Sequence, residues 1–139
     1  MSSSLVLAGC VIAAALGVAA VIGVLVNRRS GVLRDSTQVV DHGADLGLSR
    51  TGPTVVHFSA VWCGPCAAVR RVVNQVCGDL PAVAHVEIDM DANPAVARRL
   101  SVLSLPTTFI FDADGRQRYR TAGVPKAADV RSKLAPLLA

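Results

Sequence analysis

The sequence predicts an α/β domain, in which helices flank a mixed central sheet, preceded by a single N-terminal transmembrane helix. Leu5–Val26 is apolar and uncharged, and all 14 Lys and Arg and all 10 Asp and Glu follow it. Beyond that segment, short runs of β-branched residues alternate with segments of helical period, which is typical of a sheet covered by helices. The remaining residues are numerous enough to bury one core without cross-links.

The apolar segment Leu5–Val26 would span roughly 33 Å as a helix, enough for a hydrocarbon core of about 30 Å. A cleaved signal peptide is the alternative, but no Lys or Arg precedes the segment and it is longer than the usual apolar region of about 7–15 residues. Leu7–Cys10 looks like a lipoprotein processing site, yet most of the apolar run follows Cys10. We therefore expect a retained anchor.

Charge on either side of the anchor predicts its orientation. Arg28, Arg29 and Arg34 follow the segment, and the residues before it carry no basic side chain. The positive-inside rule then places the C-terminal domain in the cytoplasm, with these arginines near anionic lipid. The expected division is a tail at 1–4, a transmembrane helix at 5–26, a linker at 27–37 and the domain at 38–139.

Four segments predict the first half of the domain. Val39–Val40 is a short possible strand, and Ala44–Leu48 could form one or two helical turns. Thr54–Ser59 reads as a buried strand because it is rich in β-branched residues. A helix is expected from Pro65, with valines at helical spacing on one face, and Gly78 ends it.

The second half continues the alternation. Ala82–Asp89 reads as a strand, and Asn93–Pro94 predicts a helix start with Asn as N-cap. Thr107–Phe111 is a further core strand. Asp112–Gly115 has the chemistry of a hairpin turn, which predicts an antiparallel return. The last two elements are a strand over Arg116–Thr121 and a helix from Pro125.

Cys63 and Cys66 form the one C-x-x-C of the chain. At this spacing in a first helical turn two sulfurs can bond, and the helix N-terminus lowers the pKa of the first thiol. Cys63 is therefore the candidate nucleophile and Cys66 the resolving thiol. The alternative, half of a zinc site, needs further ligands, but the remaining candidates show no paired spacing: Cys77, His42, His57 and His85. We expect no metal.

The longer string Trp62-Cys63-Gly64-Pro65-Cys66, directly after a buried strand, resembles the active site of the thioredoxin family. Leu105-Pro106-Thr107 resembles the cis-proline segment of that family, and the likeness covers roughly residues 38–138. The resemblance implies a thioredoxin fold. It also implies that Pro106 shields the sulfurs, that Leu105 binds substrate main chain, and that Trp62, Gly64 and Pro65 join the substrate surface.

Two positions depart from the family in a coordinated way. Where the family usually has a buried Asp six positions before the first cysteine, this chain has His57, and where it often has a nearby Lys, this chain has Glu87. We hypothesise that the two form a charge-swapped pair, in which His57 accepts the proton of Cys66 at a pKa suited to neutral pH. The alternative is that His57 is a hydrogen-bonded core residue.

The function expected first is a membrane-tethered disulfide reductase acting on disulfide-containing proteins near the bilayer. It binds no cofactor beyond its Cys63–Cys66 disulfide, and the resemblance implies electrons from an NADPH-dependent flavin reductase of the thioredoxin-reductase type. One alternative is an outward-facing protein in extracytoplasmic disulfide or cytochrome maturation. Another is a non-catalytic binding module. A net charge of +4 without a basic, aromatic stripe argues against nucleic acid as a partner.

Overall fold

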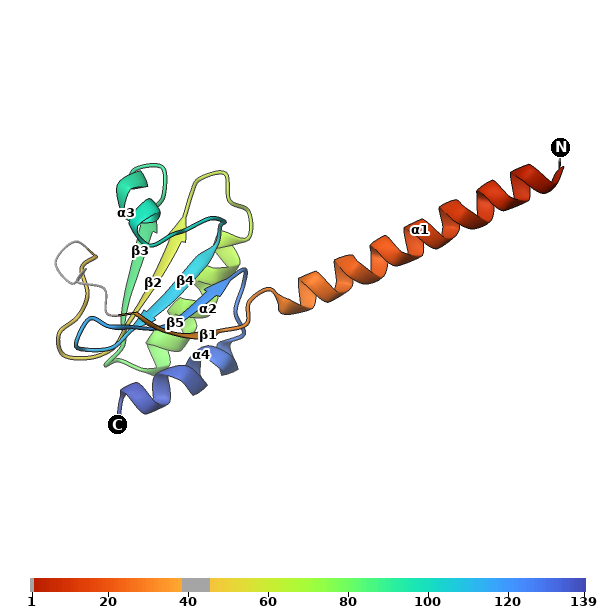
Figure 1. Ribbon diagram of the computed structural model, residues 1–139. Coiled ribbons are helices and arrows are strands. Elements are labelled where there is room, and N and C mark those ends of the chain that lie inside the picture. The colour runs from red at the N-terminus through yellow and green to blue at the C-terminus, as the bar shows by residue number, and fades with distance from the viewer. Residues whose placement is uncertain (1, 39–45) are drawn as a thin grey trace. The chain divides into compact units, whose positions relative to one another are not determined.

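The computed structural model of the protein describes residues 2–38 and 46–139 (Figure 1). The chain forms two compact units, Met1–Ser30 and Gly31–Ala139. The first unit is helix α1, Ser2–Arg29, and the second holds the sheet and the remaining helices.

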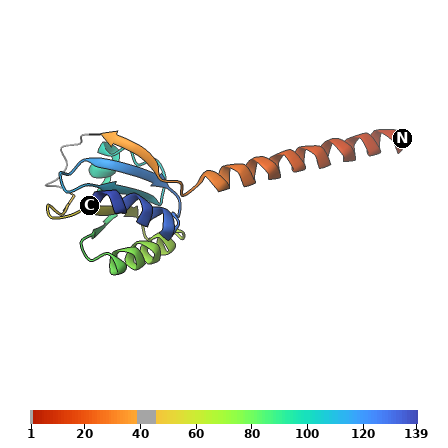
Figure 2. The ribbon, with the colours of Figure 1, turned by 90° about the horizontal axis from the view of Figure 1, so that it is seen from below.

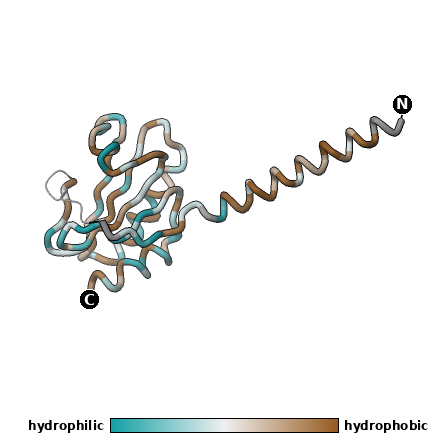
Figure 3. Tube along the Cα trace, viewed as in Figure 1, coloured by the Kyte–Doolittle hydropathy of each residue, from teal (hydrophilic) through white to brown (hydrophobic). Residues whose placement is uncertain are grey.

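Helix α1 is longer at both ends than the predicted 5–26 segment. Within it, Val6–Arg28 is a span of 23 residues that is long and apolar enough to cross a membrane. Figure 3 shows apolar character along most of the helix, and apolar residues occupy all of its faces. A helix that is apolar all round needs an apolar environment. A membrane span and a signal sequence both have this character, and the helix is compatible with either.

The second unit contains one mixed, five-stranded sheet, as the sequence predicted. Its strand order is β1-β5-β4-β2-β3. Strands β2 and β3 are parallel, whereas β2–β4, β4–β5 and β1–β5 are antiparallel. The strands span Arg34–Gln38 (β1), Thr54–Ser59 (β2), Ala84–Asp89 (β3), Thr107–Phe111 (β4) and Gln117–Ala122 (β5).

Four of the five residues of strand β1 lie in the segment that we expected to be linker, 27–37. It pairs with the free edge of β5, and the backbone N–H of Gly31 already bonds Ala122 at 2.6 Å. No local pattern in the sequence indicated this strand, because an edge strand can be polar throughout. The strand predicted at Val39–Val40 lies outside the described residues, as do the first two residues of the predicted turn at Ala44–Leu48. The other three residues of that turn are not helical.

The two faces of the sheet bury different side chains, which follows from the alternation of side chains along a strand. One core joins Val55 and Ile110 to valines of α2 and to residues of α4. The opposite core joins Val56, Phe58 and Phe109 to residues of α3. Figure 2 shows α2 and α4 on the same side of the sheet.

The helices lie close to their predicted positions. They are α2 (Cys66–Asp79), α3 (Pro94–Arg99) and α4 (Ala127–Leu134), the last followed by a 3-10 turn, η1 (Ala135–Leu137). Asn93 occupies the predicted N-cap position of α3 with Pro94 after it, but its side chain makes no capping bond. Instead its Nδ2 donates to the carbonyl of Asp89 at 3.0 Å. The turn before β5 also forms as predicted, with Gly115 at a φ of 77°.

Candidate active site

The loop from β2 to α2 places the two cysteines of the C-x-x-C side by side. Their sulfurs form a disulfide with an S–S distance of 2.09 Å and a Cα–Cα distance of 5.5 Å. The N–H of Cys66 bonds the carbonyl of Cys63 at 3.3 Å, and the N–H of Cys63 bonds that of Ala60 at 3.0 Å. These bonds make a tight turn that brings the i and i+3 sulfurs together.

The two sulfurs differ in exposure. Cys63 is half-buried, whereas Cys66 is only 2% exposed. Helix α2 begins at Cys66, so Cys63 precedes the helix rather than opening it, and Pro65 between them already has helical backbone angles. The backbone N–H groups of the first turn of α2 nevertheless lie beside the disulfide, where they favour negative charge.

The segment before β4 has the conformation that the family resemblance implied. The Leu105–Pro106 peptide bond is cis. Pro106 is buried and Leu105 is half-buried. The carbonyl of Pro106 accepts a hydrogen bond from Gly123 at 2.9 Å, and the Thr107 hydroxyl donates to Ser104 at 2.6 Å. These bonds hold the segment against the end of β5.

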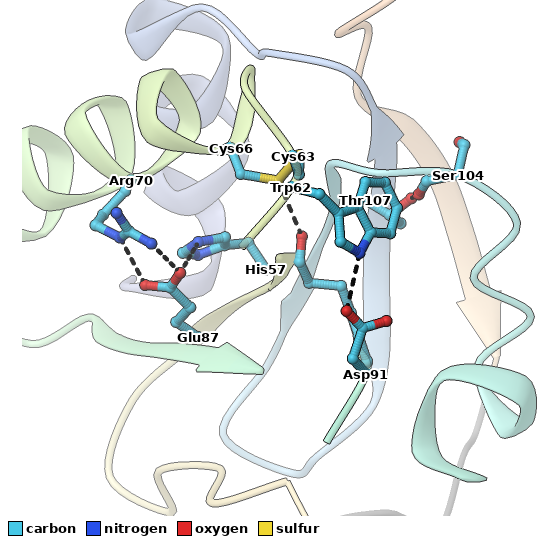
Figure 4. The surroundings of a disulfide bond; sticks show 10 residues. His57, Trp62, Cys63, Cys66, Arg70, Glu87, Asp91, Ser104 and Thr107 are labelled. Atoms are coloured by element: carbon cyan, nitrogen blue, oxygen red, sulfur yellow. Dashed lines mark hydrogen bonds and ion pairs between the residues drawn. A yellow bond between two sulfur atoms is a disulfide. The ribbon is translucent and has the colours of Figure 1, made fainter. Parts of the chain in front are cut away.

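Trp62 is the most exposed aromatic side chain of the loop, at 64%. Its indole Nε1 donates to a carboxylate oxygen of Asp91 at 2.8 Å, so the ring is held in one direction although it faces solvent (Figure 4). Asp91 was not singled out from the sequence. It lies two residues after the end of β3, and residues after parallel neighbouring strands meet at one edge of a sheet.

His57 and Glu87 come together as the hypothesis required. They face each other across the parallel β2–β3 pair, with His57 Nε2 3.5 Å from Glu87 Oε1 (Figure 4). The His57 ring is fully buried, and its Nε2 makes no hydrogen bond among the described residues. The contact is a charge–dipole approach rather than a hydrogen bond.

Glu87 has a stronger partner that the sequence did not reveal. The Arg70 guanidinium donates two hydrogen bonds to the Glu87 carboxylate, one of them 2.8 Å long. This pairing, more than the contact with His57, lowers the pKa of Glu87 to about 2. The carboxylate is therefore ionised at all physiological pH values.

The expected pKa of His57 near neutrality is wrong. Burial, only partly offset by Glu87, lowers the pKa of His57 to about 4. The physical reason is that its ring has left water entirely, which disfavours the imidazolium form. At pH 7 the ring is neutral and one of its nitrogens carries a free lone pair.

A second histidine, also missed as a site residue, continues the cluster. His57 Nδ1 lies 2.9 Å from Nε2 of His85, and His85 Nδ1 lies 3.0 Å from Oδ1 of Asn74. Asn74, Arg70 and Cys66 follow one another at intervals of four along α2, so they share one helix face. That spacing was the available sequence signal.

The remaining cysteines lie apart from this cluster. Cys77 is a free, half-buried thiol against the core of α2 and α4, and burial raises its pKa. Cys10 is in α1. In the ranges 2–38 and 46–139 no group of three or more His, Cys, Asp or Glu is placed to hold a metal ion.

A mixed sheet of this order, with a cysteine pair at the start of a helix and a cis-proline before β4, defines a thiol–disulfide oxidoreductase. The family model Thioredoxin matches residues 39–135, and the chain belongs to the thioredoxin family. Its Cys63–Cys66 disulfide is the redox-active pair, and the family acts on disulfide-containing proteins.

Individual proteins support this assignment. Thioredoxin of Mycolicibacterium smegmatis is 40% identical over 96 residues, which cover 67% of this chain and 83% of that protein. Thioredoxin of Chlamydia trachomatis is 35% identical over 87 residues, covering 63% and 84%. The crystal structure of chloroplastic thioredoxin z has a TM-score of 0.62 at 30% identity, covering 76% of this chain and 96% of that one.

Proposed function

We propose that this oxidoreductase is tethered to a membrane and reduces protein disulfides, with Cys63 as nucleophile and Cys66 as resolving thiol. The difference in exposure between the two sulfurs carries this assignment of roles. A bulky disulfide substrate can approach half-buried Cys63 but not Cys66, which is 2% exposed. The thiolate is the attacking species, and the N-terminal end of α2 stabilises a thiolate at Cys63, the outer of the two sulfurs.

The second step requires that Cys66 lose its proton before it attacks Cys63. His57 is the proposed acceptor, because at neutral pH its ring is uncharged and its Nε2 is not hydrogen-bonded. Glu87 stabilises the charge that develops on the ring, from 3.5 Å away. The bound substrate sulfur leaves as a thiolate when the new Cys63–Cys66 bond forms.

The proposed substrate surface surrounds the outer sulfur. Trp62, Gly64 and Pro65 are exposed next to Cys63, and Leu105 precedes the buried Pro106. An apolar surface of this kind suits an unfolded or extended segment around a substrate disulfide. Backbone groups at Leu105 would bind its main chain, as the family resemblance implies.

Gly-Pro between the cysteines resembles reducing members of the family, and this supports a reducing direction. The proposed electron donor is an NADPH-dependent flavin reductase of the thioredoxin-reductase type. The proposed tether is the apolar part of α1, at 5–26, with the thioredoxin domain from about residue 38 onward and β1 adding to its sheet. Arg28, Arg29 and Arg34 favour a cytoplasmic domain in contact with anionic lipid.

Trapping would test the roles of the two cysteines. The reduced Cys66→Ser variant of the full chain should accumulate a mixed disulfide with a disulfide-bonded protein substrate, whereas reduced Cys63→Ser should form none. Cys77→Ser is the matched control and should behave as wild type. If Cys63→Ser were the variant that traps substrate, the assignment of roles would be reversed.

Two further measurements would test the direction of electron transfer and the side of the membrane on which the domain lies. Equilibration of the full chain in detergent micelles with glutathione buffers should give a reduction potential near about −270 mV, while a value near about −120 mV would mark an oxidant. Fusions of alkaline phosphatase and of green fluorescent protein to the C-terminus should give fluorescence only. Phosphatase activity would favour the outward-facing alternative. If the glutathione equilibration showed no reversible two-electron step, the non-catalytic binding module would be the remaining alternative.

A further inference from the structure

The α2–β3 interface carries a continuous line of polar side chains beneath the disulfide. Three of them, at intervals of four on α2, point toward the sheet, and three come from β2 and β3. The six residues are Cys66, Arg70, Asn74, His57, His85 and Glu87. The family chemistry needs only one proton acceptor there, so the second histidine is unexplained.

The two histidine rings are joined by a short contact. His57 Nδ1 and His85 Nε2 are 2.9 Å apart, and the rings are nearly parallel, with their centroids 5.0 Å apart. The burial of the line decreases along its length: His57 is fully buried, His85 is half-buried and Asn74 is exposed. The line therefore runs from the interior beneath the disulfide to solvent.

The relay requires one placement of the protons, and the contact at Asn74 is consistent with it. An amide oxygen only accepts, so His85 Nδ1 donates to Asn74 Oδ1 at 3.0 Å. Neutral His85 then accepts at Nε2, and His57 donates from Nδ1. His57 Nε2 is left with a lone pair and no hydrogen-bond partner in the part of the chain that the structure describes.

The strand that carries the inner end of the line contacts the resolving cysteine. Cys66 Sγ is 3.9 Å from the carbonyl oxygen of Phe58, the residue that follows His57 on β2. Figure 4 shows the His57 ring beneath Cys66 and beside Glu87. The charged groups that face His57 are Glu87 from β3 and Arg70 from α2, and they are already paired with each other.

We propose that His85 is a proton-relay residue, which carries the proton of Cys66 from buried His57 to solvent during the resolving step. The proposal rests on the proposed role of His57 as acceptor. The Cys66 proton moves to His57 Nε2, the Nδ1 proton of His57 moves to His85 Nε2, and the Nδ1 proton of His85 leaves to water. No ring has to rotate.

Bonds and electrons balance in this step. The Cys66–Cys63 bond forms as the bond between Cys63 and the substrate sulfur breaks, and the electron pair leaves with the substrate thiolate, which takes a proton from water. When an electron donor later reduces the disulfide, Cys66 regains a proton. The same transfers then run in reverse, and both rings return to their starting tautomers.

A relay answers a difficulty that the burial of His57 creates. A fully buried imidazolium is costly, since the pKa of His57 is about 4. Concerted transfer to a half-buried neighbour removes the need to hold that charge inside the protein. Burial also lowers the pKa of His85, so His85 is neutral and able to accept at pH 7.

Stopped-flow kinetics on the full chain in detergent micelles would test the relay. A symmetrical aromatic disulfide releases one coloured thiolate when Cys63 attacks and a second when Cys66 resolves the mixed disulfide. The second phase does not depend on reagent concentration. His85→Gln retains a hydrogen-bonding amide but cannot relay, so the second phase should slow about tenfold or more at pH 7. The loss should shrink as the pH rises, because a larger fraction of the Cys66 thiol then ionises without a base.

Companion variants separate the relay from the role of His57. His57→Gln should slow the second phase as much as His85→Gln, and the double variant should be no slower, because the residues act as one unit. His42→Gln, at the third histidine of the chain, is the matched control. Added imidazole should restore the second phase of His85→Ala, as a mobile base at the vacated position.

Each other outcome has a definite meaning. A slow His57→Gln beside a normal His85→Gln overturns the relay and leaves the acceptor role of His57 intact. Normal rates in both variants overturn both proposals. A loss in His85→Gln that is equal at every pH, without rescue of His85→Ala by imidazole, would show that His85 has a structural role and would overturn the relay. If the losses of the two single variants multiply in the double variant, His57 and His85 act independently, and this result would also overturn the relay.

Discussion

Replacement of His57 by Gln should change how the stability of the protein depends on pH. The folded-state pKa of His57 is lowered from 6.5 to about 4 by burial. As the pH falls below 6.5, the unfolded chain binds a proton at this position before the folded chain does. The unfolding free energy is therefore unaffected by this group above about pH 6.5, and it decreases as the pH falls toward 4.

The size of this loss follows from the two pKa values. Between pH 7 and pH 5, a group with these values costs about 2 kcal/mol of unfolding free energy, and the limit at low pH is about 3 kcal/mol. His57→Gln cannot titrate, so its unfolding free energy should fall by about 2 kcal/mol less than that of wild type over the same interval.

Denaturant unfolding of the oxidised full chain in detergent micelles, followed by circular dichroism at a series of pH values, would measure this difference. His42→Gln, at another histidine of the chain, is the matched control and should keep the wild-type pH profile. Equal pH profiles for His57→Gln and wild type would refute the reasoning. An NMR titration of the His57 ring in wild type gives a second reading, and a pKa near 6.5 would refute it as well.

Three further outcomes are expected. Asp91→Ala should lower the fluorescence anisotropy of Trp62, the one tryptophan, because it removes the 2.8 Å bond to the indole; unchanged anisotropy would contradict this role. Arg70→Met should raise the pKa of Glu87 from about 2 toward 4.5 in a carboxyl NMR titration, so the stability that this carboxylate loses between about pH 4.5 and pH 2 should become smaller. Gly52→Ala should destabilise by about 1–3 kcal/mol in denaturant unfolding, since its Cβ would lie 2.2 Å from a backbone oxygen.

The sequence by itself determined the elements with strong local signals. Thr54–Ser59 and Thr107–Phe111 were predicted to the residue, because a β-branched or aromatic run bounded by turn residues has few other stable conformations. The Asp112–Gly115 turn formed for a similar reason, with Gly115 taking the positive φ that the turn needs. Spacing alone also placed Cys63 and Cys66 together.

Edge pairing was decided by the tertiary structure. Nothing in the composition of Arg34–Gln38 indicates a strand, and the segment becomes one only because β5 offers unpaired backbone groups. The predicted linker was therefore too long. A local pattern cannot report on a hydrogen-bonding partner that lies some eighty residues away in the chain.

The candidate site divides in the same way. Family resemblance identified His57 and Glu87 as a pair, and the parallel register of β2 and β3 sets them opposite each other. It did not reveal that Arg70 holds Glu87 or that His85 meets His57, because those contacts depend on how α2 lies across β3.

The pKa of His57 shows most clearly which property of the site could not be predicted from the sequence. The sequence specified an imidazole near the disulfide, and its ordinary pKa suggested a base active near neutrality. Only the packed structure excludes water from the ring and lowers that pKa to about 4. Residue type and spacing thus fixed which groups are available for chemistry, whereas burial and the contacts between elements set their charge, because solvation depends on every neighbour in the fold.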